Sequence, residues 1–326
     1  MKKVLVSGAS GIIGYGILRS LKHSGSALQL IGTSIYENSP APFFCDVFEK
    51  AVPTNDSGYI DWLLEMIAKY KIDLLIPGIE SDMYKWAEHI PAIKKTGAAV
   101  LINDTELITL CKDKWNFYQK LVEQQSPYAI KSTLASDHDE LAKEFGLPFL
   151  LKPRSGHGSK GIVRVDSSEI FLKYKNDIGA VLMAQPIIGN EDEEYTCSAF
   201  CDGKGGYYAS MTLKRKLSKE GYTVSAEVAE ISQMDEALKN LCRLFKPVGP
   251  TNFQFRLQDG NLKLLEINPR ISSATSIRTA FGYNESLMAL EYLLEGKTPQ
   301  QPLIKKGKAV RYIEDLIMYD EKGNNS

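Results

Sequence analysis

The sequence has no long hydrophobic run. No segment approaches the roughly 20 consecutive apolar residues that cross a bilayer. The apolar stretch between Met1-Lys2-Lys3 and Gly8 is also too short for the hydrophobic region of a secretory signal peptide. We therefore expect a cytoplasmic location and no membrane partner.

Zinc frameworks and strong charge are lacking as well. The five cysteines, at positions 45, 111, 197, 201 and 242, are odd in number and contain no C-x-x-C spacing, and the four histidines form no spaced pair. This pattern favours reduced core thiols over disulfides or zinc ligands. With 39 basic and 40 acidic residues, the sequence also predicts no nucleic-acid partner, because such partners require a basic surface.

The N-terminal part of the chain alternates between strand and helix patterns. This alternation predicts a parallel, Rossmann-like sheet covered by helices on both faces, over residues 1–110. Asp104 then reads as the N-cap of helices that carry Lys114. The expected strands are Val4–Val6, Leu28–Ile31, Leu74–Pro77 and Ala99–Ile102, and the helical patterns lie near Ile60–Lys69 and Met83–Lys94.

A glycine-rich turn, Gly8-Ala9-Ser10-Gly11-Ile12-Ile13-Gly14, separates the first strand from a helix that begins near Tyr15. Dinucleotide-binding units have this pattern, with phosphate at the helix N-terminus. An NAD(P)-dependent reductase or epimerase is therefore one alternative. Against it, no acidic residue directly ends the second strand, and no tyrosine has a lysine four positions later. The turn can instead shape a substrate pocket, with its helix N-terminus facing an anionic group.

A metal-binding pattern lies near the end of the chain, in Leu264-Leu265-Glu266-Ile267-Asn268-Pro269-Arg270. On a strand, Glu266 and Asn268 project to one face, and Leu265 and Ile267 to the core face. A carboxylate and an amide supply the oxygen ligands that Mg²⁺ prefers in nucleotide sites. The alternative is a plain hairpin whose polar side chains are solvated.

Gln254 joins this set only if the hairpin has the right register. A two-residue turn at Asp259-Gly260 places Gln254 opposite Leu265, whereas a three-residue loop that includes Asn261 places it opposite Glu266. The functional interpretation therefore predicts the longer loop.

A glycine-rich loop follows an apolar strand that ends at Lys152. Backbone N–H groups at such a loop can approach phosphate oxygens closely. The spacing is not that of a P-loop, and strand follows the loop where a P-loop has helix. The alternative is a flexible hairpin tip. The candidate phosphate-binding residues are Lys152, Ser155, Gly156, Gly158, Ser159 and Gly161.

Several of these elements occur in the order found in ATP-grasp enzymes, and the ordered match covers about residues 111–300. The sequence most resembles carboxylate-amine ligases and the large-subunit-like domains of carbamoyl phosphate synthetase. The resemblance implies a two-lobed ATP-grasp fold, with a small lobe over residues 111–188 and a large lobe with a C-terminal tail over residues 189–326. The matching elements are Lys114, Lys152 with its loop, Gln185-Pro186-Ile187-Ile188, Glu194-Tyr195, Gln254 and Glu266-Ile267-Asn268-Pro269-Arg270.

The resemblance also implies site roles. Lys114 and Lys152 would contact the ATP phosphates and adenine, and Glu194 would hold the ribose. Adenine would bind at the hinge residues Gln185, Ile187 and Ile188, and Mg²⁺, or alternatively Mn²⁺, at Gln254, Glu266 and Asn268.

The sequence departs from the family pattern in two regions. At the hinge, Pro186 stands where the family more often has an acidic residue. The inserted run Asn190-Glu191-Asp192-Glu193 then leaves Glu191 and Glu193 as alternative ribose ligands. Ser273 stands where carbamoyl phosphate synthetase has an arginine, which favours a different carboxylate substrate.

The substrate anion has three candidate binding groups. Arg270 and Arg278 can make bidentate contacts with carboxylates or phosphates, although Arg278 could also be a surface helix residue. The basic run Lys214-Arg215-Lys216 is either a further anion contact or a solvated strand end.

These observations predict an ATP- and Mg²⁺-dependent ligase that activates a carboxylate as an acyl phosphate and couples it to an amine. Arg270, Lys152 and Arg278 are the candidate catalytic residues. A carbamoyl-phosphate-type activity on a one-carbon acid, the reductase, and a nucleotide-binding regulatory module remain alternatives. Small-molecule acid and amine substrates are the expected partners, and a homodimer is an open alternative to a monomer.

Overall fold

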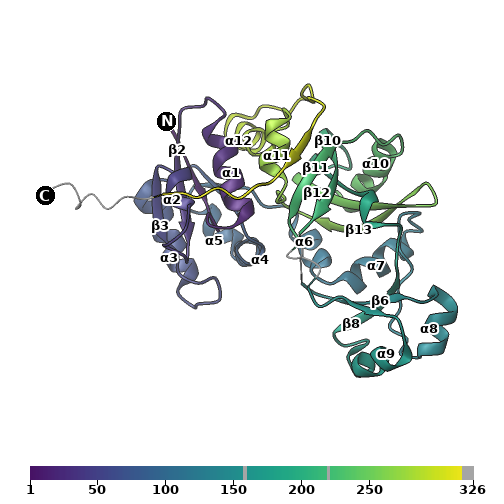
Figure 1. The fold of residues 1–326 in the computed structure, drawn as a ribbon. Helices are drawn as coiled ribbons and strands as arrows, with labels where there is room; N and C mark the ends of the chain where they lie inside the picture. Colours follow the sequence, from purple (N-terminus) through teal and green to yellow (C-terminus); the bar gives the residue numbers. More distant parts are fainter. Residues whose placement is uncertain (157–159, 219–220, 318–326) are drawn as a thin grey trace, which may run out of the picture.

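The computed structural model describes residues 1–156, 160–218 and 221–317. The described residues form three sheets, which follow one another along the chain. Figure 1 shows an N-terminal α/β domain, a large lobe beside it, and a small lobe that hangs from the large one. Among the described helices, none is both long enough and apolar enough to cross a membrane.

The N-terminal sheet is parallel, as predicted, with strand order β3-β2-β1-β4-β5. Alternate strand residues pack on opposite faces: Val4 and Val6 lie in one core cluster and Leu5 in another. The strands are β1 (Lys2–Val6), β2 (Leu28–Ser34), β3 (Val47–Lys50), β4 (Leu74–Ile76) and β5 (Ala99–Val100).

The helices of this domain are α1 (Ile12–Lys22), α2 (Ala41–Phe44), α3 (Tyr59–Tyr70), α4 (Glu80–Glu88) and α5 (Ile90–Lys94). The segment predicted as one helix over Met83–Lys94 is two helices that meet at His89. Pro91 explains the break, because proline is accommodated in the first turn of a helix and not in its interior.

Two helices from late in the sequence complete the N-terminal core. Helices α11 (Thr275–Ala280) and α12 (Glu285–Glu295) pack against α1, as both ribbon views show. Leu290 lies in the same buried cluster as Val4. The Thr279 hydroxyl donates to Ser20 Oγ at 2.8 Å. A segment predicted to belong to the large lobe thus covers one face of the N-terminal sheet.

The small lobe is built on an antiparallel sheet with order β7-β6-β8. Helix α6 precedes this sheet in the chain. Asp104 caps the N-terminus of α6, as predicted, by accepting from two backbone N–H groups. The elements are α6 (Thr105–Lys112), α7 (Lys114–Glu123), α8 (His138–Phe145), β6 (Phe149–Pro153), β7 (Val163–Val165), α9 (Ser168–Tyr174), η1 (Lys175–Asp177) and β8 (Leu182–Pro186).

The large lobe has a six-stranded antiparallel sheet with order β13-β12-β9-β10-β11-β14. Its elements are η2 (Glu191–Glu193), β9 (Glu194–Asp202), β10 (Tyr207–Leu217), β11 (Thr223–Val228), α10 (Met234–Phe245), β12 (Val248–Gln258), β13 (Asn261–Asn268) and β14 (Lys308–Val310).

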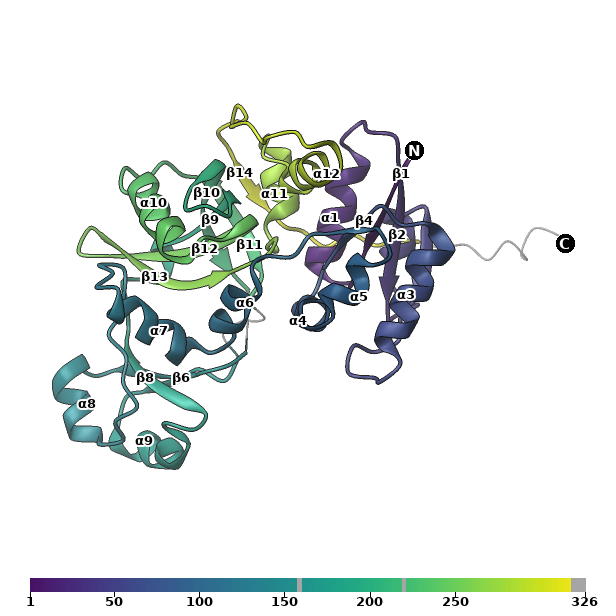
Figure 2. The ribbon, with the colours of Figure 1, turned by 180° about the vertical axis from the view of Figure 1, so that it is seen from behind.

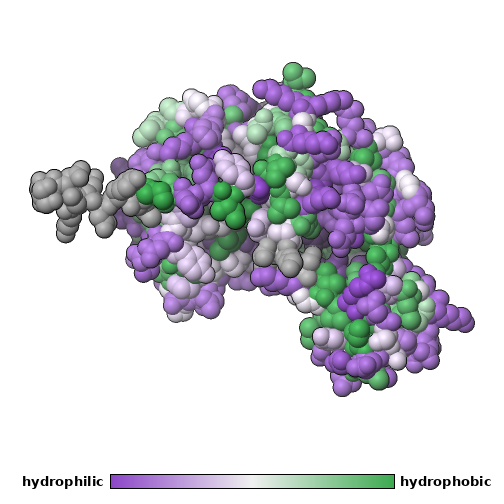
Figure 3. All heavy atoms as spheres, in the orientation of Figure 1, coloured by the Kyte–Doolittle hydropathy of each residue, from purple (hydrophilic) through white to green (hydrophobic). Residues whose placement is uncertain are grey.

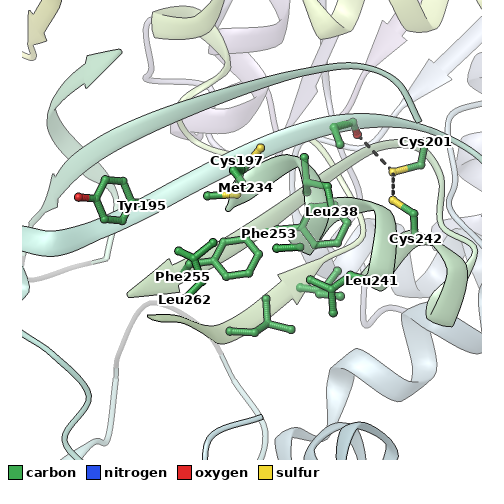
Figure 4. Close-up of a cluster of buried hydrophobic side chains, with 14 of the residues drawn as sticks. Tyr195, Cys197, Cys201, Met234, Leu238, Leu241, Cys242, Phe253, Phe255 and Leu262 are labelled. Carbon is green, nitrogen blue, oxygen red and sulfur yellow. Dashed lines mark hydrogen bonds between the residues drawn. The ribbon is translucent and has the colours of Figure 1, made fainter. Parts of the chain in front are cut away.

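Helix α10 covers one face of this sheet, and Figure 4 shows the hydrophobic core between them. The sulfur atoms of Cys201 and Cys242 lie 3.7 Å apart in this core. All five cysteines are free in the structure, and four of them are buried, as expected of core residues.

The chain crosses between the lobes at Gly189. Its φ is +53°, and a Cβ at this position would lie 2.1 Å from the Leu257 carbonyl oxygen. Only glycine tolerates this contact, so the hinge packs directly on β12.

Figure 3 shows the surface hollowed between the small lobe and the N-terminal domain.

Candidate active site

The β12–β13 hairpin brings the predicted metal ligands together by an unexpected route. Gln258 pairs with Asn261, so the turn has two residues, Asp259 and Gly260, and the predicted three-residue loop is wrong. A β-bulge after Gln254 then shifts the register and places Gln254 opposite Glu266. The predicted neighbours therefore meet, because a bulge adds the residue that the loop was expected to add.

The extra residue is Leu265, and the bulge changes where it lies. Leu264 is 2% exposed in the core, and so is Ile267 at 3%. Leu265 lines the cavities between the lobes beside Glu266. The prediction that Leu265 faces the core was wrong, because strict alternation fails at a bulge.

Glu266 is the acceptor at the centre of the metal-ligand set. Its Oε1 accepts from Gln254 Nε2 at 2.7 Å and from Asn268 Nδ2 at 3.0 Å. Turning either amide by half a turn would present its oxygen in place of its N–H groups. The set can then offer one carboxylate and two amide oxygens, which fits the oxygen preference of Mg²⁺. Within the described ranges, no group of three or more His, Cys, Asp and Glu side chains could hold a metal ion.

Lys152 and Lys114 lie across the cavity from Glu266. Both lysines line the same cavities as the Glu266 carboxylate. Burial lowers the pKa of Lys152, while the charge of Glu266 acts in the opposite direction. Burial alone would raise the pKa of Glu266, but Lys152, Asn268, Lys114 and Arg270 together outweigh it and hold the pKa below its ordinary value. The site thus balances its own charges across the gap between the lobes.

Lys114 is positioned by the start of α7. Asp113 caps this helix and forms an ion pair with Arg154 at 2.6 Å, two residues after Lys152. Lys114 Nζ donates to the Gly156 carbonyl at 2.6 Å. One carboxylate therefore ties together the two segments that carry the lysines.

The glycine loop is only partly described. Ser155 and Gly156 line the larger cavity together with Lys160, whereas Gly161 is not among its lining residues. Gly158 and Ser159, also predicted to bind phosphate, lie outside the described residues.

The hinge residues form one wall of the site. Gln185 and Ile188 line the larger cavity, and Ile187 does not. The Gln185 side chain is 7% exposed and donates from Nε2 to Ser132 Oγ at 3.0 Å.

Of the three candidate ribose ligands, Glu194 alone lines the larger cavity. Its two carboxylate oxygens accept from Arg215 and from Arg256, each at 2.9 Å. Glu191 and Glu193 lie on η2 and are not among the lining residues. As the ribose ligand, Glu194 would share its oxygens with two arginines.

The basic run on β10 is split between two sides, as strand alternation requires. Arg215 is 4% exposed and faces the cavity, where it also donates to Gln254 Oε1. Lys216 pairs with Asp192 at 2.8 Å on an exposed surface. Arg215 therefore links the ribose candidate to the metal-ligand set.

The two predicted anion-binding arginines have different surroundings. Arg270 lines the larger cavity and contacts Asn268 Oδ1 at 3.2 Å and the Glu80 carboxylate. Arg278 is fully buried, contacts Asn252 and Ser272, and lines neither cavity. It is not the surface helix residue of the alternative interpretation.

Two adjoining cavities hold these side chains. The main cavity has a volume of about 300 Å³ and contains residues of both lobes, and a side cavity of about 50 Å³ shares Lys152, Glu266 and Asn268 with it. The N-terminal domain contributes Ile12 and Ile13, the first residues of α1, to the main cavity, and it contributes Glu80, Met83 and Tyr84 to the side cavity.

The sequence analysis did not identify any residue of α4 as a candidate site residue. A signal was present: α4 begins just after a parallel strand, and ligands of open α/β sheets bind at the carboxyl ends of the strands.

Two family models match parts of the chain. Residues 15–102 match a model described as the PylC-like N-terminal domain, and residues 181–316 match one described as ATP-grasp in the biosynthetic pathway with Ter operon. The chain thus contains a PylC-like N-terminal domain and an ATP-grasp domain.

Similar proteins include large chains of carbamoyl phosphate synthase. The one from Methanothrix thermoacetophila is 26% identical over 322 residues, which cover 87% of this chain and 29% of that protein. The one from Methanosarcina mazei is 24% identical over 320 residues, with the same coverage of each. The chain therefore spans less than a third of the length of these relatives.

Two solved structures illustrate the shared fold. N5-carboxyaminoimidazole synthetase from Staphylococcus aureus, complexed with ADP, has a TM-score of 0.70 at 16% identity and covers 93% of this chain and 80% of that one. Biotin carboxylase from Campylobacter jejuni has a TM-score of 0.73 at 17% identity and covers 94% and 74%.

These matches and the sheet topology confirm the ATP-grasp resemblance and the predicted fold class. The N-terminal model is described as PylC-like, so the reductase interpretation of the glycine turn gains no support.

Proposed function

We propose that the protein is a Mg²⁺- and ATP-dependent ligase that joins a carboxylate to an amine. The carrying observation is that one cavity is lined by the wall of Glu266, Gln254 and Asn268 together with Lys114 and Lys152. Structural neighbours crystallised with ADP and with MgADP support a nucleotide in this cavity. Mn²⁺ is the proposed alternative metal.

In the proposed reaction, a carboxylate oxygen of the acid attacks the γ-phosphorus of ATP, and the bond to ADP breaks. The amine nitrogen then attacks the acyl carbon, loses a proton, and expels phosphate. Bound Mg²⁺ would neutralise charge on the phosphates. Lys114 and Lys152 would position the phosphates, and Arg270 would hold the acid or its acyl phosphate.

The remaining proposed roles follow the positions around the main cavity. Adenine would bind at the hinge residues Gln185, Ile187 and Ile188, of which Gln185 and Ile188 line the main cavity. The ribose would bind at Glu194, which also lines it. The loop with Ser155, Gly156, Gly158, Ser159 and Gly161 would cover the phosphates. Gln254, Glu266 and Asn268 would bind the metal.

A one-carbon acid is the second candidate substrate. The relatives named carbamoyl phosphate synthase favour it, and Ser273 in place of the family's arginine disfavours it.

The test is ADP release across a matrix of acids and amines that includes bicarbonate. We expect one pairing to stimulate release, and Glu266→Gln to abolish it because the metal-ligand set loses its only charge. Glu88→Gln is the matched control, since Glu88 is exposed at the far end of α4. Absence of stimulated release from every pairing, or full release by Glu266→Gln, would overturn the ligase proposal.

A further inference from the structure

The N-terminal domain approaches the proposed metal-binding wall of Gln254, Glu266 and Asn268 through Glu80, the first residue of α4. A Cβ on Gly78, two residues earlier, would lie 2.1 Å from the Ser7 carbonyl oxygen and 2.8 Å from the Gly14 Cα. The turn that precedes α4 thus packs directly on Ser7, just after β1, and on the first turn of α1, which only glycine permits. This close contact fixes the start of α4 at the carboxyl edge of the sheet.

The Glu80 carboxylate binds Arg270 from this position. Arg270 Nε donates to Glu80 Oε1 at 3.0 Å, and Nη2 donates to the same oxygen. The two side chains are 15% and 13% exposed, so solvent screens the pair only weakly. Further donors of the guanidinium reach Asn268 Oδ1 at 3.2 Å and the Ile271 carbonyl at 3.1 Å. Acceptors on several sides therefore hold the plane of the guanidinium.

This arrangement keeps Arg270 from pairing with Glu266. Asn268 lies between the two residues, because it donates to the Glu266 carboxylate and accepts from Arg270. Among the described residues, the ion pair of Arg270 is with Glu80. If that carboxylate lost its charge, Glu266, which Asn268 already connects to Arg270 by hydrogen bonds, would be left to attract the guanidinium. Such a pair would occupy the carboxylate proposed to bind metal.

We propose that Glu80 is a positioning residue that holds Arg270 away from Glu266, so that one wall binds metal and the substrate anion side by side. The inference rests on the proposed function, because it assigns Glu266 to Mg²⁺ and Arg270 to the acid. It also makes the N-terminal domain part of the metal site, because Glu80 lines the side cavity together with Glu266 and Asn268.

The test measures ADP binding by calorimetry, with and without Mg²⁺, so it does not require the substrates. Glu80→Gln keeps the shape of the side chain and removes its charge. We expect the Mg²⁺-dependent part of ADP affinity to fall by about tenfold, the low end for residues that support metal ligands. ADP affinity in EDTA and the response of Glu88→Gln should match the wild type.

A double variant separates positioning from simple loss of structure. Removing the guanidinium as well, in Glu80→Gln with Arg270→Gln, should restore the Mg²⁺-dependent affinity because nothing then competes for Glu266. Binding of inorganic phosphate to the Mg²⁺–ADP form should stay weak in the double variant, since the anion-binding group is gone.

Two results would overturn the inference while the proposed nucleotide site stands: wild-type Mg²⁺ dependence in Glu80→Gln, or no restoration in the double variant. A wild-type protein that shows no Mg²⁺-dependent ADP binding would overturn the proposed function itself, together with the inference.

Discussion

Arg270 and Arg278 show how one residue type serves two purposes in this protein. Arg270 lines the main cavity, whereas Arg278 is buried among Asn252, Ser272 and Glu285. Glu285 is itself fully buried. A buried carboxylate that loses its cation is costly, so the position of Arg278 indicates a contribution to stability.

We therefore predict that Arg278→Met destabilises the protein by about 3–5 kcal/mol, the range for breaking a buried ion pair. Urea unfolding would measure the loss. Arg270→Met should cost less, because its side chain and that of Glu80 are partly exposed whereas Arg278 and Glu285 are fully buried. A stable Arg278→Met protein with a raised KM for the acid would restore Arg278 as a substrate ligand.

At the scale of elements, the bulge in β13 gives neighbouring leucines opposite roles. Leu264 lies in the core and Leu265 lines the cavities. Leu264→Ala should cost about 2–5 kcal/mol, as for buried leucines in general. Leu265→Ala should leave the free energy of unfolding nearly unchanged and weaken ATP binding. The reverse pattern in thermal melts and ATP titrations would mean that the bulge is misplaced.

The ion pair between Asp113, at the start of α7, and Arg154 should depend on pH. Burial alone would raise the pKa of Asp113, but the Arg154 guanidinium and the N–H groups of α7 outweigh it and leave the pKa below its ordinary value. A lowered folded pKa means that the ionised form stabilises the protein above about pH 4, the ordinary value for aspartate. This contribution disappears as the pH falls through the lowered pKa.

Asp113→Asn keeps an N-cap and loses the ion pair, so we expect a deficit of at most about 1 kcal/mol at pH 7. The deficit should shrink as the pH falls below about 4 and vanish below the lowered pKa, where folded wild-type Asp113 loses its charge. Asp113→Ala should cost about 1 kcal/mol more because the cap is lost too. Unfolding curves across this pH range measure both effects, and a deficit independent of pH would contradict the assignment to the ion pair.

At the scale of the whole molecule, the two nucleotide interpretations differ in which ligand stabilises the fold. A ligand at a hundred times its Kd stabilises a protein by about 2.7 kcal/mol. We expect a clear rise of Tm with Mg²⁺–ATP and none with NAD or NADP. Stabilisation by a dinucleotide alone would reinstate the glycine turn as its binding site.

Much of this architecture could be predicted from the sequence because local patterns specify it. Strand and helix periodicity gave the parallel sheet, and spaced motifs gave the lobes. Alternation placed Glu266 beside Asn268, but it missed the bulge, because the pairing of two strands decides a bulge and no single segment signals it. Glu80 was missed because its partner lies far away in the sequence. The boundaries at residues 110 and 188, the homodimer and the cytoplasmic location stay predictions.

The packing of α11 and α12 on α1 also bears on how the chain is made. The first strands to be synthesised belong to a sheet with one face covered by helices near the other end of the sequence. Until those helices leave the ribosome, the apolar side chains of α1 and β4 that pack against them lack this cover, and exposed apolar surface of this kind promotes aggregation. A fragment that ends before α11 therefore faces the same hazard permanently, which makes the isolated N-terminal domain a poor candidate for separate expression.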